Sequence, residues 1–168
     1  LKKYLCVELT EITGIERGFL KESRLISKEM ERGGPNRAVY VAPDLKSSVM
    51  VNEEDHIRMQ CIEGGLQLGN VQEHLASLDE EISRVVGYSF HEKFGYLTAC
   101  PTNVGTGLRA SVMMHLPGLT LRRQVDGAFQ GLAQRGLTVR GFHGENSEHL
   151  GDFFQISNEV TLGKSVEE

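Results

Sequence analysis

The chain has no tryptophan and little proline or cysteine, and these shortages exclude several classes of protein. Its 168 residues include four prolines and three cysteines. An odd number of widely spaced cysteines does not suit the disulfide framework of a small secreted domain, and it does suit reduced thiols in a cytosol. No apolar run approaches the length of a bilayer span, and no signal peptide is visible. The sequence therefore predicts a cytoplasmic protein without a membrane segment.

An excess of positive charge is also lacking. The formal net charge is -5 at pH 7, which gives no electrostatic reason to expect binding to nucleic acid or to an anionic membrane. The length suits one domain with a buried core. Because the chain opens at Leu1 rather than Met and stops at Glu168 without a clear ending, we interpret residues 1–168 as a single domain that forms part of something longer.

Hydrophobic periodicity predicts an α+β domain. Helices are expected over most of residues 2–32, over 69–87 and over 120–135. Short β-rich runs predict strands at residues 37–43, 47–52, 56–62, 94–100, 110–116, 137–142 and 153–162. The turn between the second and third of these strands holds Glu53, Glu54 and Asp55, which indicates a hairpin. Hairpins interrupted by helices predict a mostly antiparallel β-sheet with helices packed on one face.

Two of the predicted helices carry candidate core positions. In residues 2–32 the candidates are Ile15, Phe19, Ile26 and Met30. The helix over 69–87 is the clearest amphipathic one, with Asn70 as its expected N-cap and Gly87 as its expected end. One face of that helix gathers Val71, Leu75, Leu78, Ile82 and Val85.

The stretch CPTNVGTGLRASV, residues 100–112, combines a thiol, two glycines around a threonine, and an arginine. Gly105 to Ala110 matches the G-x-G-x-x-A pattern of a dinucleotide-binding loop. That pattern must open a helix, whereas the residues from Val112 to Pro117 favour a strand. The alternative is an anion-binding loop beside a reactive cysteine. Cys100 itself is either a buried structural thiol or a partly exposed thiolate.

The acidic triplet of the hairpin has two interpretations. Alternation along a strand would place Glu54, His56 and Arg58 on one face, subject to the geometry of the turn. The plainer interpretation is a solvated turn. Asp55 and His56 are of metal-ligand types, but no second histidine at ligand spacing supports a metal site, so we predict none.

Three arginines lie beside loops or turns with acids nearby. Arg58 follows the acidic triplet, Arg109 follows the glycine-rich loop, and Arg140 precedes the loop GFHGENSE. Each alone would be interpreted as a surface residue. A guanidinium group matches phosphate oxygens with two parallel hydrogen bonds. Together the three arginines therefore predict a polyphosphate clamp.

Three motifs of the chain resemble the hallmarks of the ATP:guanidino phosphotransferases, the family of creatine kinase and arginine kinase. They are GYLTACPTNVGTGLRASV, VNEEDHIRM, and VRGFHGENSE followed by FQISN, and all three occur in family order. The resemblance extends over roughly residues 25–163. It implies the catalytic domain of that family, an antiparallel sheet flanked by helices with a glutamine synthetase-like fold.

Within this family the chain looks most like the bacterial protein-arginine kinases. Met113 follows RASV where the animal enzymes usually have histidine, and His143 stands where animal arginine kinases have a second arginine. The bacterial branch also lacks that arginine. The resemblance therefore implies ATP-dependent transfer of the γ-phosphoryl group to arginine side chains in proteins.

The resemblance also implies a set of site residues. Glu54 is expected to align the acceptor guanidinium and take its proton, with Glu145 or Glu148 as the second carboxylate. Cys100, as a thiolate that accepts a hydrogen bond from Thr102, is expected to steady the guanidinium charge. Mg²⁺ is expected to be held mainly by the phosphates of ATP. The expected ATP-binding residues are Arg58, Arg109, Ala110, Ser111, Val112, Met113, Arg140, Gly141, Phe142, His143, Gly144 and Glu145.

The partners that the resemblance implies are ATP and proteins with exposed arginine. A bacterial stress role would add a Clp-type protease system, an activator protein and a heat-shock repressor, with a homodimer in the full-length protein. We expect an upstream phosphate-binding Ser-Arg-x-Arg segment and a C-terminal helical region to lie outside this chain, so that the piece alone phosphorylates poorly. Two alternatives stay open: a kinase for a free guanidino compound such as arginine, and a catalytically silent module that binds nucleotide or phosphoarginine.

Overall fold

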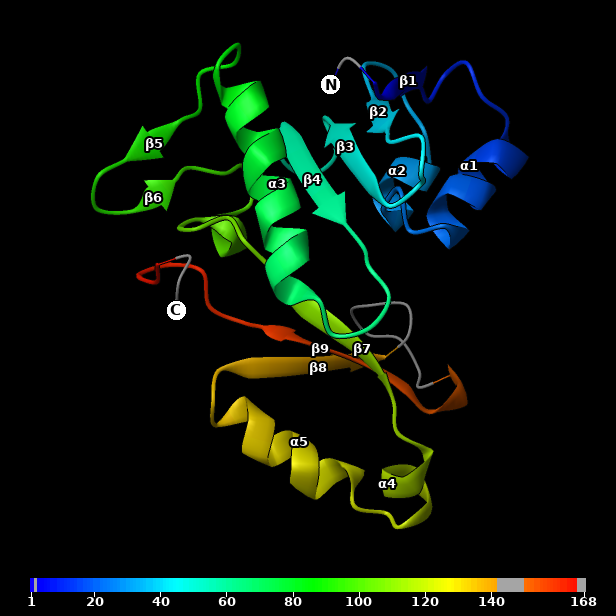
Figure 1. Ribbon diagram of the computed structural model, residues 1–168, viewed down its shortest axis with the longest axis vertical. Coiled ribbons are helices and arrows are strands. Elements are labelled where there is room, and N and C mark those ends of the chain that lie inside the picture. Colours follow the sequence, from blue (N-terminus) through cyan, green and yellow to red (C-terminus); the bar gives the residue numbers. More distant parts are fainter. Residues whose placement is uncertain (2, 142–149, 166–168) are drawn as a thin grey trace. The chain divides into compact units, whose positions relative to one another are not determined.

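The computed structural model describes residues 1, 3–141 and 150–165 (Figure 1). The chain divides into two compact units, one of Leu1–Phe90 with Leu97–Pro101, and one of His91–Tyr96 with Thr102–Glu168. Within the described ranges, no helix is both long and apolar enough to cross a membrane. All three cysteines are described, and none of them forms a disulfide.

The first unit is built on a four-stranded antiparallel sheet in the order β1-β2-β3-β4. The hairpin predicted around the acidic triplet is present, with Val51 paired to Ile57. The strands are β1 (Leu5–Glu8), β2 (Ala38–Val41), β3 (Ser47–Val51) and β4 (Ile57–Cys61). The helices are α1 (Gly14–Glu22), α2 (Lys28–Glu31) and α3 (Leu68–Ser83).

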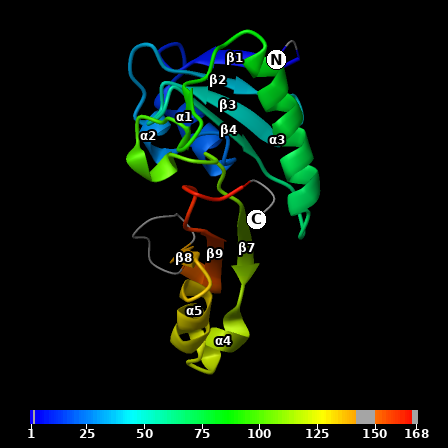
Figure 2. The ribbon, with the colours of Figure 1, turned by 90° about the vertical axis from the view of Figure 1, so that its left-hand side faces the viewer.

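Helices cover both faces of this sheet (Figure 2). Met50 of the central strand β3 joins the apolar cluster of α1 and α2, whereas its neighbour Val49 packs with Leu78 and Ile82 of α3. Neighbouring residues of a strand point to opposite faces, so β3 is buried on both sides. The predicted placement of helices on one face is therefore wrong for this unit, although the α+β class is confirmed.

The N-terminal segment differs from the long helix predicted there. Residues 5–8 form β1, and α1 starts only after Thr13, whose side chain forms a capping box with Glu16. Ile15 and Phe19 are 87% and 56% exposed, so their predicted burial is wrong. Ile26 and Met30 are buried, as predicted.

Helix α3 is confirmed, but its predicted ends are wrong. It begins after Gln67 and ends before Arg84, so Asn70 is not its N-cap and Gly87 lies beyond its end. Leu78 and Ile82 are buried as predicted, and Val71 and Leu75 are half-buried. Val85 lies past the last turn and is 84% exposed, which contradicts its predicted place on the apolar face.

The second unit holds a three-stranded antiparallel sheet in the order β7-β9-β8. The helix predicted over 120–135 is two helices separated by Arg122 to Gln124, and Gly136 follows the second with φ of 74°. The division of the chain into units falls within β5 (Phe90–His91), which pairs with β6 (Gly95–Tyr96), and within the 3-10 turn Pro101–Asn103. The remaining elements are β7 (Ser111–His115), α4 (Pro117–Leu121), α5 (Val125–Ala133), β8 (Leu137–Gly141), the 3-10 turn Leu150–Asp152 and β9 (Phe153–Asn158).

One face of the three-stranded sheet is apolar and the other is polar. Phe154 of β9 is 1% exposed and meets Phe129 of α5 edge to face, with 5.0 Å between the ring centroids. Ile156 lies two residues after Phe154 on β9 and therefore shares its face. The register places Val112 of β7 and Val139 of β8 directly beside Ile156, on that same face. Helix α5 therefore covers the apolar face.

Candidate active site

The hairpin of β3 and β4, with Glu53, Glu54 and Asp55 in its turn, is called the acidic hairpin below. Its three acidic side chains differ in their surroundings. Glu53 is inward, with a side chain that is only 4% exposed. Its Oε1 accepts a hydrogen bond from Ser27 Oγ at 2.5 Å, and its Oε2 accepts one from the backbone N–H of Glu54 at 2.8 Å. This residue was not predicted for the site, and its position beside Glu54 gave no signal of its inward orientation.

Glu54, the predicted catalytic carboxylate, points outward. The residue is exposed, and in the described part of the chain no hydrogen bond or ion pair engages its carboxylate. Its backbone is nevertheless held through Glu53. A carboxylate that is free on a held backbone is available to bind a guanidinium or accept its proton.

Asp55 connects the hairpin to Cys100 within the same unit. Its Oδ1 accepts a hydrogen bond from the backbone N–H of Cys100 at 3.1 Å. The carbonyl of Cys100 accepts another from Thr98 Oγ1 at 2.6 Å. The structure therefore brings Cys100 to the acidic hairpin, and hydrogen bonds on both sides of the residue fix its backbone.

Arg58, on β4, lies beside the hairpin that precedes it. Its Nη1 is 3.3 Å from Glu53 Oε1, while half of its side chain remains exposed. The guanidinium therefore keeps accessible N–H groups after pairing with Glu53, because it carries five donors.

In the second unit, Asn158 holds the backbone on both sides of Arg109. Its Oδ1 accepts from the N–H of Ala110 at 2.8 Å, and its Nδ2 donates to the carbonyl of Leu108 at 3.1 Å. Arg109 itself is exposed. Asn158 was not predicted for the site, although it ends the motif FQISN, because a motif does not tell which backbone its side chain meets.

The polar face of the β7-β9-β8 sheet carries several of the predicted ATP-binding residues. Gln155 of β9 stands opposite Met113 on β7 and opposite Arg140 on β8, so these three share a face. Gln155 Nε2 also donates to Ser111 Oγ at 2.9 Å. Val112 lies on the opposite, apolar face, and the register places Gly141 there as well. From those two positions only backbone groups can serve a ligand on the polar face.

The glycines before Arg109 have structural roles of their own. A Cβ on Gly105 would lie 2.2 Å from the carbonyl oxygen of Thr161, and Gly105 also has φ of 119°. Gly107 has φ of 62°, and a Cβ there would make only an ordinary contact, at 4.0 Å, with the carbonyl oxygen of Asn103. The residues that follow form the strand β7, as expected, so the stretch does not open the helix that a dinucleotide loop requires.

Five predicted site residues, Phe142, His143, Gly144, Glu145 and Glu148, lie outside the described residues. The choice between Glu145 and Glu148 therefore stays as predicted. Among the residues that are described, no group of three or more His, Cys, Asp or Glu side chains is placed to hold a metal ion.

Comparison with known proteins decides the family. The family described as "ATP:guanido phosphotransferase, C-terminal catalytic domain" matches residues 1–168. The chain belongs to this ATP:guanido phosphotransferase family. It is 49% identical over 166 residues to a protein-arginine kinase of Geobacillus kaustophilus, covering 99% of this chain and 46% of that protein. It is 50% identical over 160 residues to a protein-arginine kinase of Pelotomaculum thermopropionicum, covering 95% of this chain and 45% of that protein.

Solved structures of two kinases share the fold. The duplicated taurocyamine kinase of Schistosoma mansoni, with bound transition-state analogue components, superposes with a TM-score of 0.85 at 28% identity. It is matched over 97% of this chain and 24% of that one. A lombricine kinase gives a TM-score of 0.81 at 27% identity, over 97% of this chain and 48% of its own. The predicted family and fold are therefore confirmed, and the chain spans about half the length of the curated relatives it matches.

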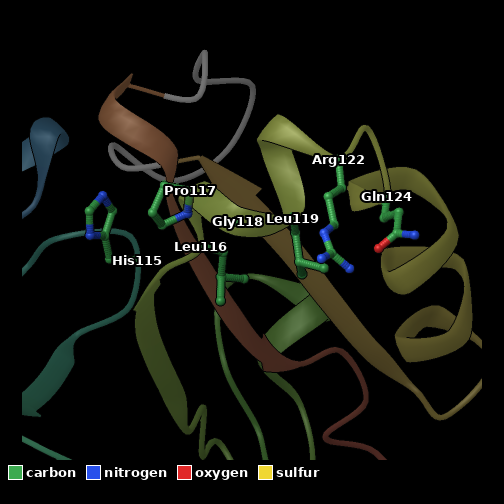
Figure 3. Close-up of a pocket in the computed structure, with 7 residues that line it drawn as sticks. All are labelled: His115, Leu116, Pro117, Gly118, Leu119, Arg122 and Gln124. Atoms are coloured by element: carbon green, nitrogen blue, oxygen red, sulfur yellow. The ribbon is translucent and has the colours of Figure 1, made fainter.

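The second unit of this guanido phosphotransferase chain also has a surface pocket of about 520 Å³. Figure 3 shows its lining, which runs from the end of β7 through α4 and includes His115, Leu119, Arg122 and Gln124. The described lining includes none of the residues predicted for ATP or for catalysis. His115 is turned to Phe153, with which its ring stacks at 4.5 Å.

Proposed function

We propose that the protein carrying this chain is an ATP-dependent protein-arginine kinase. The observation that carries the proposal is the state of Glu54, an exposed carboxylate without a partner in the described chain, between two acids that the fold engages. The identities of 49% and 50% to protein-arginine kinases, against 27% and 28% to the kinases of lombricine and taurocyamine, support arginine in proteins as the acceptor.

In phosphoryl transfer the protein chiefly aligns the donor with the acceptor and neutralises the charge on the phosphate oxygens. We assign neutralisation of the phosphate oxygens to Arg58, Arg109 and Arg140. Removing one preorganised donor of this kind reduces the rate by about 100-fold or more. Ser111 and Met113, with backbone groups of Ala110, Val112 and Gly141, would add contacts to ATP.

The acceptor requires its own residues. A guanidinium has a pKa above about 12, so it reaches the site protonated. As the N–P bond forms and the bond from the γ-phosphorus to the bridging oxygen of ADP breaks, one N–H proton must leave. We assign that proton to the carboxylate of Glu54. Cys100 as a thiolate, held by Asp55 and Thr98, would offset the positive charge of the acceptor.

Mg²⁺ would accompany ATP and be bound through its phosphate oxygens. Bound Mg²⁺ neutralises charge that develops on those oxygens. Glu145 or Glu148 remains our proposal for the second acceptor carboxylate.

A cytoplasmic stress role follows from this proposal as a further expectation. Phosphorylated arginine side chains would mark proteins for a Clp-type protease, a heat-shock repressor would be one substrate, and an activator protein would set the rate. A homodimer of the full-length protein belongs to the same proposal.

The proposal is tested by offering two acceptors to the full-length protein with ATP and Mg²⁺. One acceptor is an unfolded protein rich in arginine, and the other is free arginine at equal guanidinium concentration. We expect acid-labile phosphate on the protein and none on the free amino acid. Transfer only to free arginine would replace the protein acceptor by a small guanidino compound, and binding of ATP without any transfer would favour a silent module.

A further inference from the structure

Ser27 lies just outside the acidic hairpin and outside every motif that identified the family. It is the N-cap of α2, and its Oγ accepts a hydrogen bond from the backbone N–H of Met30 at 3.2 Å. The same Oγ donates to Glu53 Oε1 at 2.5 Å. One hydroxyl group therefore caps a helix and also contacts the turn that presents Glu54.

Glu53 is a buried charge with a complete set of partners. An ionised carboxylate that is 4% exposed is strongly destabilised unless donors surround it. Here Ser27 and Arg58 contact Oε1, and the N–H of Glu54 contacts Oε2. Burial alone would raise the pKa of Glu53, but the hydrogen bonds from Ser27 and Glu54 and the charge of Arg58 bring the pKa below its ordinary value. The carboxylate is therefore ionised at neutral pH.

We propose that Ser27 and Glu53 form a positioning pair that sets the direction of the Arg58 guanidinium and the backbone conformation of Glu54. The Ser27 hydroxyl fixes the Glu53 carboxylate, and that carboxylate holds the two residues that would meet ATP and the acceptor. Neither member of the pair has to touch a substrate. The inference rests on the proposed function, since it names what holds the reacting groups in place.

The two roles of Ser27 can be separated by substitution. Ser27→Gly removes the hydroxyl but keeps most of the N-cap preference, because glycine at an N-cap weakens a helix by only a few tenths of a kcal/mol. Ser27→Thr keeps both the cap and the hydroxyl. Thr13→Gly is the matched control, because it removes the N-cap hydroxyl of α1. Among the described residues that hydroxyl bonds only within its own helix turn, through Glu16.

The readouts are kcat/KM for ATP across pH and the Kd of Mg-ATP for the full-length protein. For Ser27→Gly we expect kcat/KM to fall about tenfold and the Kd to rise, as for loss of a hydrogen bond to a charged group. The acid limb of the pH profile should move to higher pH, because the pKa of Glu53 rises when a donor is lost. Ser27→Thr and Thr13→Gly should keep the wild-type limb.

Three results would overturn the positioning pair. One is a Ser27→Gly protein with the wild-type Kd and acid limb, and another is a Thr13→Gly protein with the same shift. The third is a higher Mg²⁺ requirement in Glu53→Gln alone, which would make Glu53 a metal ligand instead. If the wild-type protein transfers no phosphoryl group at all, the proposed function fails, and the Kd of Mg-ATP still tests the pair.

Discussion

At the residue scale, the neighbours of Glu54 explain why three consecutive acids stand in one turn. The Glu53 carboxylate is hydrogen-bonded to Ser27 and Arg58, and the Asp55 carboxylate to the backbone N–H of Cys100. Glu54 is exposed to solvent. Sequence motifs predicted Glu54, Arg58 and Cys100. They could not predict the division of roles, because it depends on the contact of the turn with α2, distant in sequence.

The ionised state of Glu53 predicts a stability that depends on pH. Because its pKa is lowered in the folded protein, its contribution is present above the unfolded pKa of about 4.3 and is lost as the pH falls through the folded value. Glu53→Gln should therefore destabilise the protein by about 1–3 kcal/mol at pH 7. Urea unfolding from pH 7 to about pH 3 should show this difference shrinking, and a difference that stays constant would contradict the assignment.

Asp55 gives a second prediction at this scale. Asp55→Ala removes the acceptor for the Cys100 N–H and should lower kcat about tenfold, whereas Asp55→Asn keeps an Oδ1 acceptor and should retain most of the rate. Asp44→Ala is the control, because Asp44 also accepts a backbone N–H, that of Lys46, in an exposed turn. Equal rates for Asp55→Ala and the wild type would show that this bond does not position Cys100.

At the element scale, most of the strands and helix α3 were predictable, whereas β1 and the ends of the helices were not. Alternating apolar residues located β2, β3, β4, β7, β8 and β9 correctly. The missed core positions Ile15, Phe19 and Val85 have apolar side chains that the fold leaves exposed. Helix α3 starts without a side-chain cap at Gln67, so the usual N-cap signal pointed instead to Asn70. Packing against the sheet, rather than local preference, fixed these boundaries.

The glycine-rich loop that contains Gly105 and Gly107 gives a prediction at the element scale. Gly105→Ala should destabilise the second unit severely, because its Cβ would collide with the backbone of Thr161. Gly107→Ala should be milder, at about 1 kcal/mol, since only its positive φ opposes alanine. Thermal unfolding of both variants tests this, and equal losses would mean that close backbone approach is not the reason for Gly105.

At the scale of the whole molecule, the family was predictable because three motifs retain their order along the chain. The division into two compact units was not, since hydrophobic periodicity reports strands without saying which strands share a sheet. For the same reason the sequence did not predict which residues share a face of the β7-β9-β8 sheet. Val112 lies on one face, and Ser111, Met113 and Arg140 lie on the other.

The central claim is that Glu54 takes the proton of an arginine guanidinium during phosphoryl transfer. Its most direct test is the initial rate of phosphoarginine formation on a protein substrate, followed by ³¹P NMR, for the full-length wild type and Glu54→Gln. We expect the wild type to produce an acid-labile N–P signal, and the variant to be slower by about 100-fold or more with unchanged thermal stability. A Glu54→Gln protein that forms phosphoarginine at the wild-type rate would contradict the account.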